Sequence, residues 1–368
     1  MSSIFWCSSC LAMSTRNRIT FDKDFKCNAC CWAEKKKKLD WSKRQKQLEN
    51  LLDKHRSSNK EFDCLVPVSG GKDGSYVSYQ LKEKYGMNPL CLTVKPPLQL
   101  DIGNQNLQNF INSGYSLISV DPDINTMQFL NKNGFIDMGF PYYGWLIAIQ
   151  SIPVKFANRL GINLIFYGED GEVEYGGSSE TSQDYIYDVN YMKKVYLEGG
   201  YSKRLEAAES KNLNGVELFK FPENVNKSLE ITHWSYFENW DPYRNYLIAK
   251  EHCGLIENEK TNSGTFTNFA QNDQALYSLH TYLMYLKFGF GRANQDACID
   301  IRRGAMDRSQ AINLVKFYDG KYPEEFIKLY LDYYQMNLEE FENILDKWAN
   351  KKLFTKSQGK WVPNFEIK

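Results

Sequence analysis

The sequence has no surplus of charge of either sign. Its 368 residues include 45 Lys and Arg against 45 Asp and Glu, so the formal net charge is zero and the pI is about 6.9. Broad binding of nucleic acid or of an anionic membrane surface depends on an excess of basic side chains that neutralise phosphates. The balanced total argues against both classes of partner, although it leaves room for a local basic pocket.

Long apolar runs are missing as well. No stretch of 18 apolar residues occurs, so no transmembrane helix is predicted. The first 13 residues lack a basic segment, and Cys and Ser interrupt their apolar residues, which argues against a signal peptide. We therefore expect a soluble, cytoplasmic protein. Its hydrophobic content of 42% suffices for a well-packed core, and its length predicts two domains or one large domain with appendages.

Cysteine, in contrast, is abundant. Four of the nine cysteines form two CxxC pairs, Cys7 with Cys10 and Cys27 with Cys30, separated by residues 11–26. In a reducing compartment this spacing is typical of a zinc ribbon, in which a short hairpin depends on one ion held by four thiolates. We predict a structural zinc site, because four cysteines leave no open coordination position. An iron–sulfur cluster and four unrelated buried thiols are the alternatives.

A phosphate site is predicted at residues 69–75. The apolar run 63–68 is typical of a buried strand, and it leads directly into the sequence SGGKDGS and then into an amphipathic helix that ends at Gly86. Backbone N–H groups and the helix dipole attract anions at such a helix start. We expect Gly70 and Gly71 to let a phosphate approach the main chain, because neither has a Cβ atom.

The loop differs from two common nucleotide motifs. A Walker A motif would have Gly where Val66 stands and Ser or Thr where Asp73 stands, and the GxGxxG pattern is absent. Asp73 is the informative residue, because its carboxylate can hold Mg²⁺ against a pyrophosphate. The segment resembles the PP-loop (SGGxDS) of ATP pyrophosphatases, which split ATP between the α- and β-phosphates. Gly74 is an insertion relative to that motif and leaves open whether Ser75 or only Ser69 contacts phosphate.

The pattern of the following segments predicts a doubly wound, mostly parallel α/β sheet. Further strands are expected at 89–94, 116–120 and 162–167, with helices at 100–111, 124–135 and 144–160. Ligands bind such sheets at the carboxyl ends of the strands. The fourth strand ends in Gly168, Glu169 and Asp170, so we predict that these residues orient Mg²⁺ or the adenylated group. A solvated turn is the alternative.

Other segments carry weaker signals. Residues 178–230 read as an insertion with helices at 184–197 and 203–211, and a strand is expected at 231–237. His233 lies among aromatic residues there, where a hydrogen-bonded structural histidine is more typical than a catalytic one. The C-terminal third is predicted to be helical.

Basic residues gather near the C-terminal end. Lys287 and Arg292 flank two glycines in the sequence KFGFGR, and Arg303 follows shortly after. We expect a mobile, anion-facing loop in which these three cations neutralise the α-phosphate or a substrate diphosphate. The alternative is a set of surface charges paired with Asp296 and Asp300.

Almost the whole chain resembles the N-acetyl sugar amidotransferases of surface-polysaccharide, lipopolysaccharide and nonulosonic-acid biosynthesis. The resemblance rests on the paired CxxC segments, the SGGKDGS form of the loop, YGED at 167–170 and KFGFGR…DIRRG at 287–304. The resemblance implies that Gly74, an insertion relative to the SGGxDS motif, is normal in this family. It implies an adenine nucleotide α-hydrolase-like fold and an ATP-dependent ligase-like transferase that converts an acetamido group of a nucleotide-type or nonulosonate-type sugar to acetamidino, through an adenylated imidate attacked by ammonia.

The predicted site residues form three groups. The predicted catalytic residues are Asp73, Glu169, Lys287 and Arg292. The predicted nucleotide and Mg²⁺ contacts are Ser69, Gly70, Gly71, Lys72, Asp73, Gly74, Ser75, Gly168, Asp170 and Arg303. The predicted zinc ligands are Cys7, Cys10, Cys27 and Cys30.

The source of ammonia is predicted to be another protein. Neither Cys253 nor Cys298 lies in an elbow motif of a glutaminase nucleophile, and the first cysteine, Cys7, is too far from the start to be an N-terminal nucleophile. The resemblance implies a separate glutaminase partner related to the one that serves histidine synthesis. Neither membrane nor nucleic-acid binding is expected.

Two other functions compete with this interpretation. A tRNA thiolation enzyme uses the same adenylation, but it needs a sulfur-carrying cysteine near the loop and a basic RNA surface, whereas Cys64 and Cys91 lie inside predicted strands. A nucleotide-sensing scaffold would bind ATP without turnover.

Four segments are expected along the chain. They are a zinc-ribbon module at 1–35, a linker helix within 36–60 that places Leu48, Leu51 and Leu52 on one face, a PP-loop domain at 61–260 and a helical C-terminal region at 261–368.

Overall fold

A parallel five-stranded sheet forms the centre of the computed structural model, which describes residues 4–56 and 61–367. The strands are β1 (Cys64–Pro67), β2 (Pro89–Val94), β3 (Leu117–Val120), β4 (Leu164–Tyr167) and β5 (Glu230–His233). Their order is β3-β2-β1-β4-β5, and all four pairings are parallel. The order reverses between β1 and β4, so ligands are expected at the carboxyl ends of these two strands. The predicted doubly wound α/β fold is confirmed.

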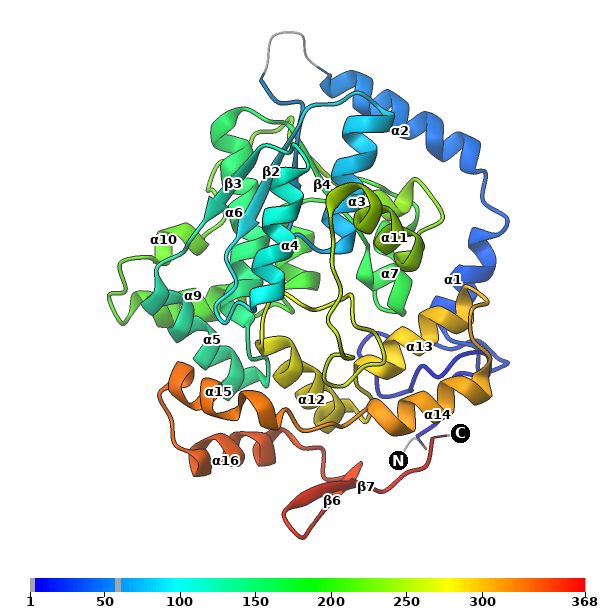
Figure 1. Cartoon of the computed structure of the whole chain (residues 1–368), viewed down its shortest axis with the longest axis vertical. Helices are drawn as coiled ribbons and strands as arrows, with labels where there is room; N and C mark the ends of the chain where they lie inside the picture. Colours follow the sequence, from blue (N-terminus) through cyan, green and yellow to red (C-terminus); the bar gives the residue numbers. More distant parts are fainter. Residues whose placement is uncertain (1–3, 57–60, 368) are drawn as a thin grey trace.

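Side chains of alternate strand residues face two different cores. Leu65 of β1 packs with Leu90 and Leu92 of β2 on one face, whereas Val66 and Cys91 point to the other. The first face packs against α5 (Ile124–Met138) and α6 (Tyr143–Leu160), and the second against α3 (Lys72–Tyr79), α4 (Asp101–Asn112) and α11 (Pro242–Cys253) (Figure 1). Burial on both faces explains why the strands are near-continuous apolar runs.

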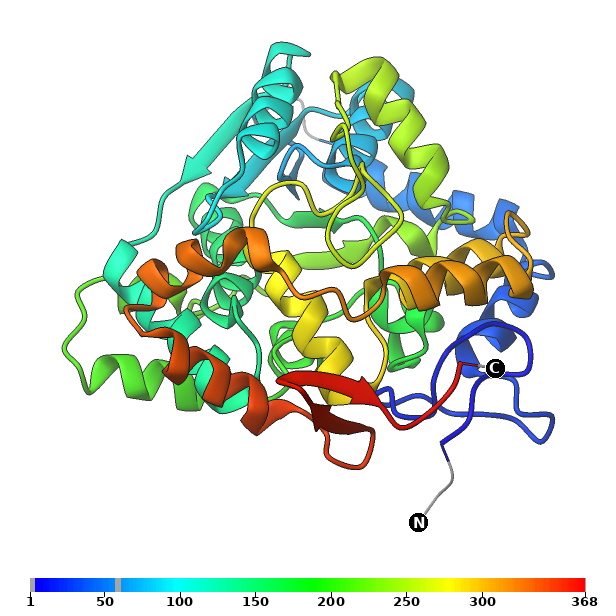
Figure 2. The same cartoon turned by 60° about the horizontal axis from the view of Figure 1, so that its bottom comes forward.

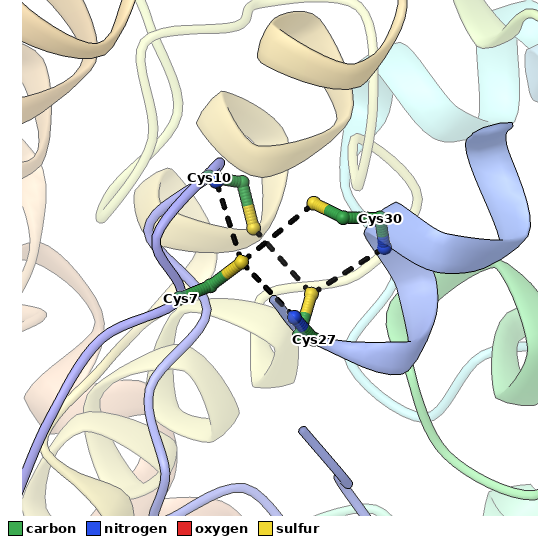
Figure 3. Close-up of side chains that lie close together, drawn as sticks. All are labelled: Cys7, Cys10, Cys27 and Cys30. Atoms are coloured by element: carbon green, nitrogen blue, oxygen red, sulfur yellow. Dashed lines mark hydrogen bonds between the residues drawn. The ribbon is translucent and has the colours of Figure 1, made fainter. Parts of the chain in front are cut away.

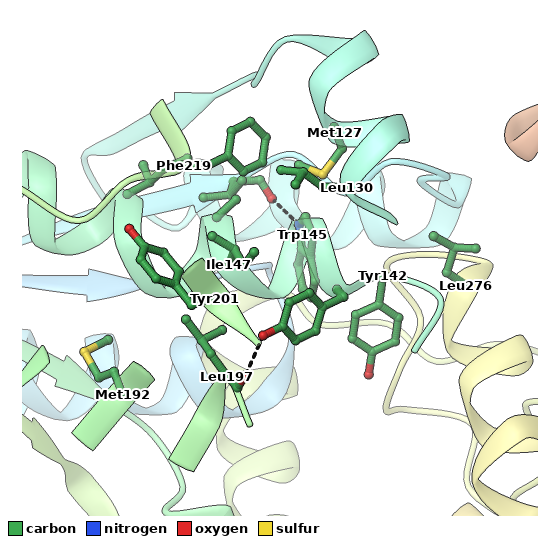
Figure 4. Close-up of a cluster of buried hydrophobic side chains, with 14 of the residues drawn as sticks. Met127, Leu130, Tyr142, Trp145, Ile147, Met192, Leu197, Tyr201, Phe219 and Leu276 are labelled. Carbon is green, nitrogen blue, oxygen red and sulfur yellow. Dashed lines mark hydrogen bonds between the residues drawn. The ribbon is translucent and has the colours of Figure 1, made fainter. Parts of the chain in front are cut away.

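The larger core extends well beyond the sheet. Figure 4 shows Trp145 and Ile147 of α6 among side chains of α5, of the insertion and of the C-terminal region, which include Leu197 and Leu276. The Trp145 backbone N–H donates to Asn131 Oδ1 at 3.1 Å. The insertion and the C-terminal region therefore share one hydrophobic core with the nucleotide-binding sheet.

The insertion is less regular than predicted. It contains a 3₁₀ turn (Glu180–Ser182), α8 (Val189–Tyr191), a π-helical turn (Met192–Tyr196), α9 (Tyr201–Glu209) and α10 (Val216–Phe219). The helix expected from residue 184 begins after Asp188, which caps Tyr191 N. The strand expected at 231–237 ends at His233, because residues 234–236 turn into a 3₁₀ helix.

The first part of the N-terminal segment packs against the C-terminal helices, whereas α2 (Trp41–His55) packs against the core of the sheet. The segment comprises α1 (Asn28–Lys36) and α2, and it contains single antiparallel bridges, Trp6 with Met13 and Phe21 with Cys27, in place of the expected hairpin. The predicted amphipathic helix is confirmed: α2 buries Leu48, Leu51 and Leu52. The turns around the first cysteine pair lie beside α13 and α14 (Figure 2).

The C-terminal region is helical with one exception. Its helices are α12 (Leu276–Phe288), α13 (Arg292–Arg302), α14 (Arg308–Tyr318), a 3₁₀ turn (Glu324–Phe326), α15 (Ile327–Tyr334) and α16 (Leu338–Trp348). A hairpin of β6 (Phe354–Ser357) and β7 (Lys360–Pro363), which the sequence analysis did not predict, follows them. The loop expected at 287–292 is shorter than predicted: α12 continues to Phe288, Gly289 and Gly291 form a tight turn, and a helix begins at Arg292. Among the described helices, none has the length and apolarity needed to cross a membrane.

Candidate nucleotide pocket and metal centre

A pocket of about 300 Å³ lies where β1 and β4 end. The loop after β1, the end of β4 and the segment that precedes α12 line it, together with residues of α4, α7 (Gly171–Tyr175), α12 and α13. The predicted site residues that line it are Ser69, Gly71, Lys72, Asp73, Gly74, Glu169 and Arg292. The structure thus brings together, from positions more than 200 residues apart, seven residues that the sequence analysis assigned to one site.

The three loop glycines have different roles. Gly70 has φ +80°, and a Cβ there would lie 2.5 Å from the backbone N of Leu107, so the residue allows close packing against α4. Gly70 does not line the pocket, so its expected role in phosphate approach stays a prediction. A Cβ on Gly74 would lie 3.0 Å from Pro67 O, so Gly74 lets α3 pack on β1. Gly71 caps α3 without a side-chain hydrogen bond and opens onto the pocket. The first N–H groups of α3 are consequently available to an anion.

Two carboxylates face each other at the ends of β1 and β4. Asp73 forms an ion pair with Lys72 Nζ through Oδ2, while its Oδ1 has no partner among the described residues. A Cβ on Gly168 would lie 3.0 Å from Asp73 Cβ, so the end of β4 abuts this side chain. Burial and then the charge of Asp73 raise the pKa of Glu169 to about 7. A divalent cation would relieve this repulsion, and an unpartnered carboxylate oxygen is a ligand that Mg²⁺ prefers, so the pair fits Mg²⁺.

Arg292 is the first residue of α13 and closes one wall of the pocket. Its Nε lies 2.8 Å from Asp296 Oδ1, and the two side chains are only 17% and 10% exposed. Asp296 also accepts a hydrogen bond from Thr265 Oγ1 at 2.6 Å. The pairing with Asp296 that the alternative predicted is therefore present, but this ion pair is largely buried and not on the surface.

Two of the predicted cations do not reach the pocket. Lys287 Nζ donates to the carbonyl of Met138 at 2.8 Å and lies over the ring of Trp348, because the last turn of α12 directs it toward α5. Its predicted catalytic role is not supported by this position. Arg303 pairs with Asp300 at 2.7 Å and lines a different pocket.

Three further predicted contacts also lie outside the pocket. Asp170 caps α7 (Gly171–Tyr175) by accepting from Glu172 N and Val173 N, so it stabilises a helix start. Ser75 is fully buried on α3, and its Oγ has no partner in the described parts of the chain. Gly168 packs between Asp73 and Trp240 and acts through its small size. Ser69 is thus the predicted serine that faces the pocket.

His233 occupies a separate, buried position at the end of β5. Its ring stacks on Tyr187 with centroids 4.7 Å apart, and burial lowers its pKa. It is not part of the nucleotide pocket, which agrees with the structural role favoured by the sequence analysis.

Residues 269–273 form one wall of the pocket, and their role was not predicted from the sequence. Side-chain amides hold this segment: Asn262 Nδ2 donates to Asn272 Oδ1 at 2.6 Å, and Asn258 Nδ2 donates to the same oxygen at 3.2 Å. Burial raises the pKa of Asp273 to about 7, and Asp273 Oδ2 has no partner in the described chain. The signal available in the sequence was the repeated asparagine at 258, 262, 268 and 272.

The four cysteines of the paired CxxC segments converge on one point (Figure 3). Their sulfur atoms all lie within 4.8 Å of one another, with 3.8 Å between Cys7 and Cys30 and 3.7 Å between Cys10 and Cys27. Backbone N–H groups point at the sulfurs, for example Cys27 N at 3.2 Å from Cys7 Sγ. Hydrogen bonds from neighbouring thiols, of which that from Cys27 is the strongest, lower the pKa of Cys10 well below its ordinary value. The four sulfurs are therefore close enough together to hold one metal ion as thiolate ligands.

The fifth cysteine of this region does not belong to the cluster. Cys31 Sγ lies 3.6 Å from Asp22 Oδ2 and is half-buried. The cluster instead contacts the C-terminal helices, because Arg302 Nη1 lies 3.8 Å from Cys10 Sγ and Asn294 Nδ2 donates to Leu11 O at 2.9 Å.

The C-terminal region matches a known family. Residues 263–366 match the model described as "LPS biosynthesis protein WbpG-like, C-terminal domain". This region is similar to the C-terminal domain of WbpG-like proteins. The match supports the family resemblance seen in the sequence, and the WbpG-like domain supplies Arg292 and residues 269–273 to the pocket of the SGGKDGS loop. The two parts that form this pocket are therefore a loop that resembles a PP-loop and a region similar to the C-terminal domain of WbpG-like proteins.

Two other proteins resemble parts of this chain. The uncharacterized protein MJ1599 of Methanocaldococcus jannaschii is 30% identical over 88 residues, which cover 24% of this chain and 32% of that protein. The chain thus spans about a third of the length of this curated relative. Among solved structures, the U34-tRNA thiolase NcsA from Methanococcus maripaludis with its [4Fe-4S] cluster is 14% identical. That comparison covers 72% of this chain and 79% of NcsA, with a TM-score of 0.31.

Proposed function

We propose that this protein is an ATP-dependent amidotransferase that converts the acetamido group of a sugar to an acetamidino group. The observation that carries the proposal is the composite pocket, in which a WbpG-like domain contributes Arg292 opposite Asp73 and Glu169 of the PP-loop sheet. An ATP pyrophosphatase site joined to a domain of lipopolysaccharide biosynthesis is expected to activate a sugar substrate. The amide of an acetamido sugar is a suitable target, because its oxygen leaves only after activation.

The reaction has two steps. The acetamido oxygen attacks the α-phosphorus of ATP and expels pyrophosphate, which gives an adenylated imidate. Ammonia then adds to the imidate carbon, a proton is lost, and AMP leaves with the former amide oxygen. Each step develops negative charge on a phosphate oxygen, so fixed donors and cations in the pocket accelerate it.

The pocket residues supply these donors and cations. The N–H groups at the start of α3, beside Gly71, bind the phosphates, and Arg292 neutralises charge that develops during pyrophosphate release. Asp73 and Glu169 would hold Mg²⁺, which supplies Lewis-acid stabilisation to the phosphate oxygens. Lys72 pairs with Asp73 in this structure and is positioned to contact a phosphate once the carboxylate binds the cation.

Ammonia is proposed to come from a glutaminase partner. Burial raises the pKa of Cys253 to about 11 and raises that of Cys298 as well, so neither thiol is activated as a nucleophile. Both are fully or nearly fully buried. This supports a separate subunit that hydrolyses glutamine.

The metal of the cysteine cluster is proposed to be zinc. Four sulfurs at about 2.3 Å from one tetrahedral ion lie about 3.8 Å from one another. The distances of 3.7 and 3.8 Å agree with this value. A four-iron cluster would place its own atoms between the sulfurs and hold them farther apart, so the geometry favours a single ion.

Thiolation of tRNA is the competing function, and the structure offers little support for it. Burial raises the pKa of Cys91 to about 12 and that of Cys64 well above its ordinary value, and both residues lie inside strands. Neither is placed to carry sulfur to a substrate.

The test is to incubate the protein with Mg–ATP, an ammonium salt and a panel of acetamido sugars. We expect release of pyrophosphate and AMP, and a sugar product with the mass change of NH replacing O. Pyrophosphate release without that product, or tight and salt-sensitive tRNA binding with sulfur transfer, would contradict the proposal.

A further inference from the structure

A second pocket lies on the other side of Glu169 from the nucleotide pocket. It has a volume of about 250 Å³ and is formed by the end of α1, the segment before α11 and the last turn of α13. Glu169 lines both pockets. A molecule bound in the second pocket therefore lies next to the residue that faces the bound nucleotide.

Cations predominate in the wall of this pocket. Lys36, Lys37, Arg302 and Arg303 line it, against the carboxylates of Glu169, Glu174 and Asp241. Two of these carboxylates are already engaged. Glu174 pairs at 2.7 Å with Lys36, which is itself one of the four cations, and Asp241 caps α11 by accepting from Tyr243 N and Arg244 N.

Two cations retain capacity for a ligand. Lys37 is exposed at the end of α1 and forms no ion pair with a described side chain. Arg303 pairs closely with Asp300 through Nε at 2.7 Å, but its Nη1 lies 3.8 Å from Asp241, which is too long for a hydrogen bond. The remaining N–H groups of the Arg303 guanidinium can therefore donate hydrogen bonds to an anionic ligand. The pocket thus attracts negative charge.

Two tryptophans give the pocket its apolar surface. Trp240 lies against Gly168, with 3.3 Å between its Cη2 and the position of a Cβ on that glycine, so it stands beside Glu169. It is 5% exposed, and its indole Nε1–H has no partner within the described residues. The indole ring of Trp240 thus offers the pocket an apolar face, while its N–H is buried. Trp41 lines the same pocket.

We propose that this second pocket binds the acceptor, an acetamido sugar that carries a carboxylate or a diphosphate. The sugar ring lies against Trp41 and Trp240, its anionic group contacts Lys37 and Arg303, and its acetamido group points to Glu169. A volume of about 250 Å³ is at the lower end for small-molecule sites, so the pocket holds the sugar ring and leaves any nucleotide outside. This assignment rests on the proposed function, because it makes the ligand the substrate of the amidation.

Calorimetric titration of the full-length protein tests the site without turnover. The probes are N-acetylneuraminic acid for a carboxylate, UDP-N-acetylglucosamine for a diphosphate, and N-acetylglucosamine as the neutral control. We expect at least one anionic probe to bind about tenfold or more tightly than the neutral sugar, and the tighter one identifies the anion.

Charge variants test the residues. Arg303→Ala and Lys37→Glu are expected to weaken binding of that probe by about tenfold or more, whereas Arg303→Lys retains most of it. Lys38→Glu is the matched control, because Lys38 is the exposed neighbour of Lys37 and does not line the pocket. Affinity for ATP, which is measured in parallel, is expected to stay unchanged in all four variants and reports whether they are folded.

The outcomes separate the site from the reaction. Binding that depends on Lys37 and Arg303, without any amidino product, supports the site and contradicts the proposed function. Amidino product with an unchanged KM for sugar in Arg303→Ala and Lys37→Glu overturns the site and leaves the function, as expected if the pocket admits only ammonia. Failure of every anionic probe to bind also overturns the site.

Discussion

Arg292 and Arg302 lie at the two ends of one helix and contact two different centres. Arg292 begins α13 in the wall of the nucleotide pocket, and Arg302 ends it with Nη1 3.8 Å from Cys10 Sγ. Ten residues of helix separate them by about 15 Å. The cysteine cluster therefore contacts the helix that carries Arg292, so we expect a metal bound there to influence nucleotide binding.

Loss of the metal is expected to destabilise the protein and to weaken ATP binding. Cys7→Ser should contain no stoichiometric metal by elemental analysis and should be poorly soluble, because the fold of the N-terminal segment depends on the ion. Where soluble protein is recovered, its affinity for ATP should fall by about tenfold, since Arg292 loses its fixed position.

Cys31→Ser is the matched control for this prediction. Cys31 adjoins Cys30 in sequence, but it is not among the four clustered sulfurs. It should keep the metal, the solubility and the affinity for ATP. A stable, metal-free and active Cys7→Ser protein would show that the cluster is not a structural metal site.

Asp73→Ala is expected to abolish pyrophosphate release while the fold stays intact. The unpartnered Oδ1 and the adjacent Glu169 make Asp73 the residue best placed to hold the cation, so its removal should lower the rate by at least about 10²-fold. The measurement is pyrophosphate release with Mg–ATP and sugar, together with circular dichroism.

A carboxylate elsewhere on the same sheet serves as the control. Asp121 follows β3 as Asp73 follows β1, but it pairs with Lys95 on the exposed surface. Asp121→Ala should retain activity. Retained activity in Asp73→Ala would remove this residue from the mechanism.

Two cations that the sequence treats alike should behave differently. Arg292→Ala is expected to lower kcat/KM for ATP by about 10²-fold, because the guanidinium lines the nucleotide pocket. Lys287→Met keeps the apolar stem of Lys287 and should leave KM for ATP unchanged, since that ammonium group contacts Met138 O instead. Equal losses in both variants would contradict the arrangement of the pocket.

Local sequence patterns were sufficient to predict the sheet and the first half of the site. The run 89–94 coincides with β2, and the strand, turn and helix order around SGGKDGS gave the position of Asp73 at a carboxyl end of the sheet. These features depend on contacts between neighbours in the chain. The cysteine cluster was predictable for the same reason, because the spacing within each CxxC pair brings its two sulfurs together.

The remaining part of the site depends on packing between distant segments. Nothing in the KFGFGR sequence indicates that Lys287 ends one helix while Arg292 begins the next, so that they point to different places. Nor does the composition near Arg303 reveal that this residue lines a second pocket with Trp240. Side-chain direction at a helix end is decided by the neighbouring helix, and a single sequence does not contain that information.

A buried acid in the pocket should make stability depend on pH. Burial raises the pKa of Asp273 to about 7, from about 3.9 in the unfolded chain. Between about pH 4 and pH 7 the folded state keeps a proton that the unfolded state has lost, so a rise in pH favours unfolding. An asparagine at position 273 would carry no charge at any pH in this range, so it would not have this effect.

The expected result is that Asp273→Asn gains stability relative to the wild type as the pH rises from 4 to 8. The gain in unfolding free energy is up to about 4 kcal/mol, and denaturant titrations at each pH measure it. Asp332→Asn, on the exposed surface of α15, should show a difference that does not change with pH. If the Asp273→Asn difference were equally flat, Asp273 would be charged in the folded protein, and a cation or a donor would have to lie beside its Oδ2.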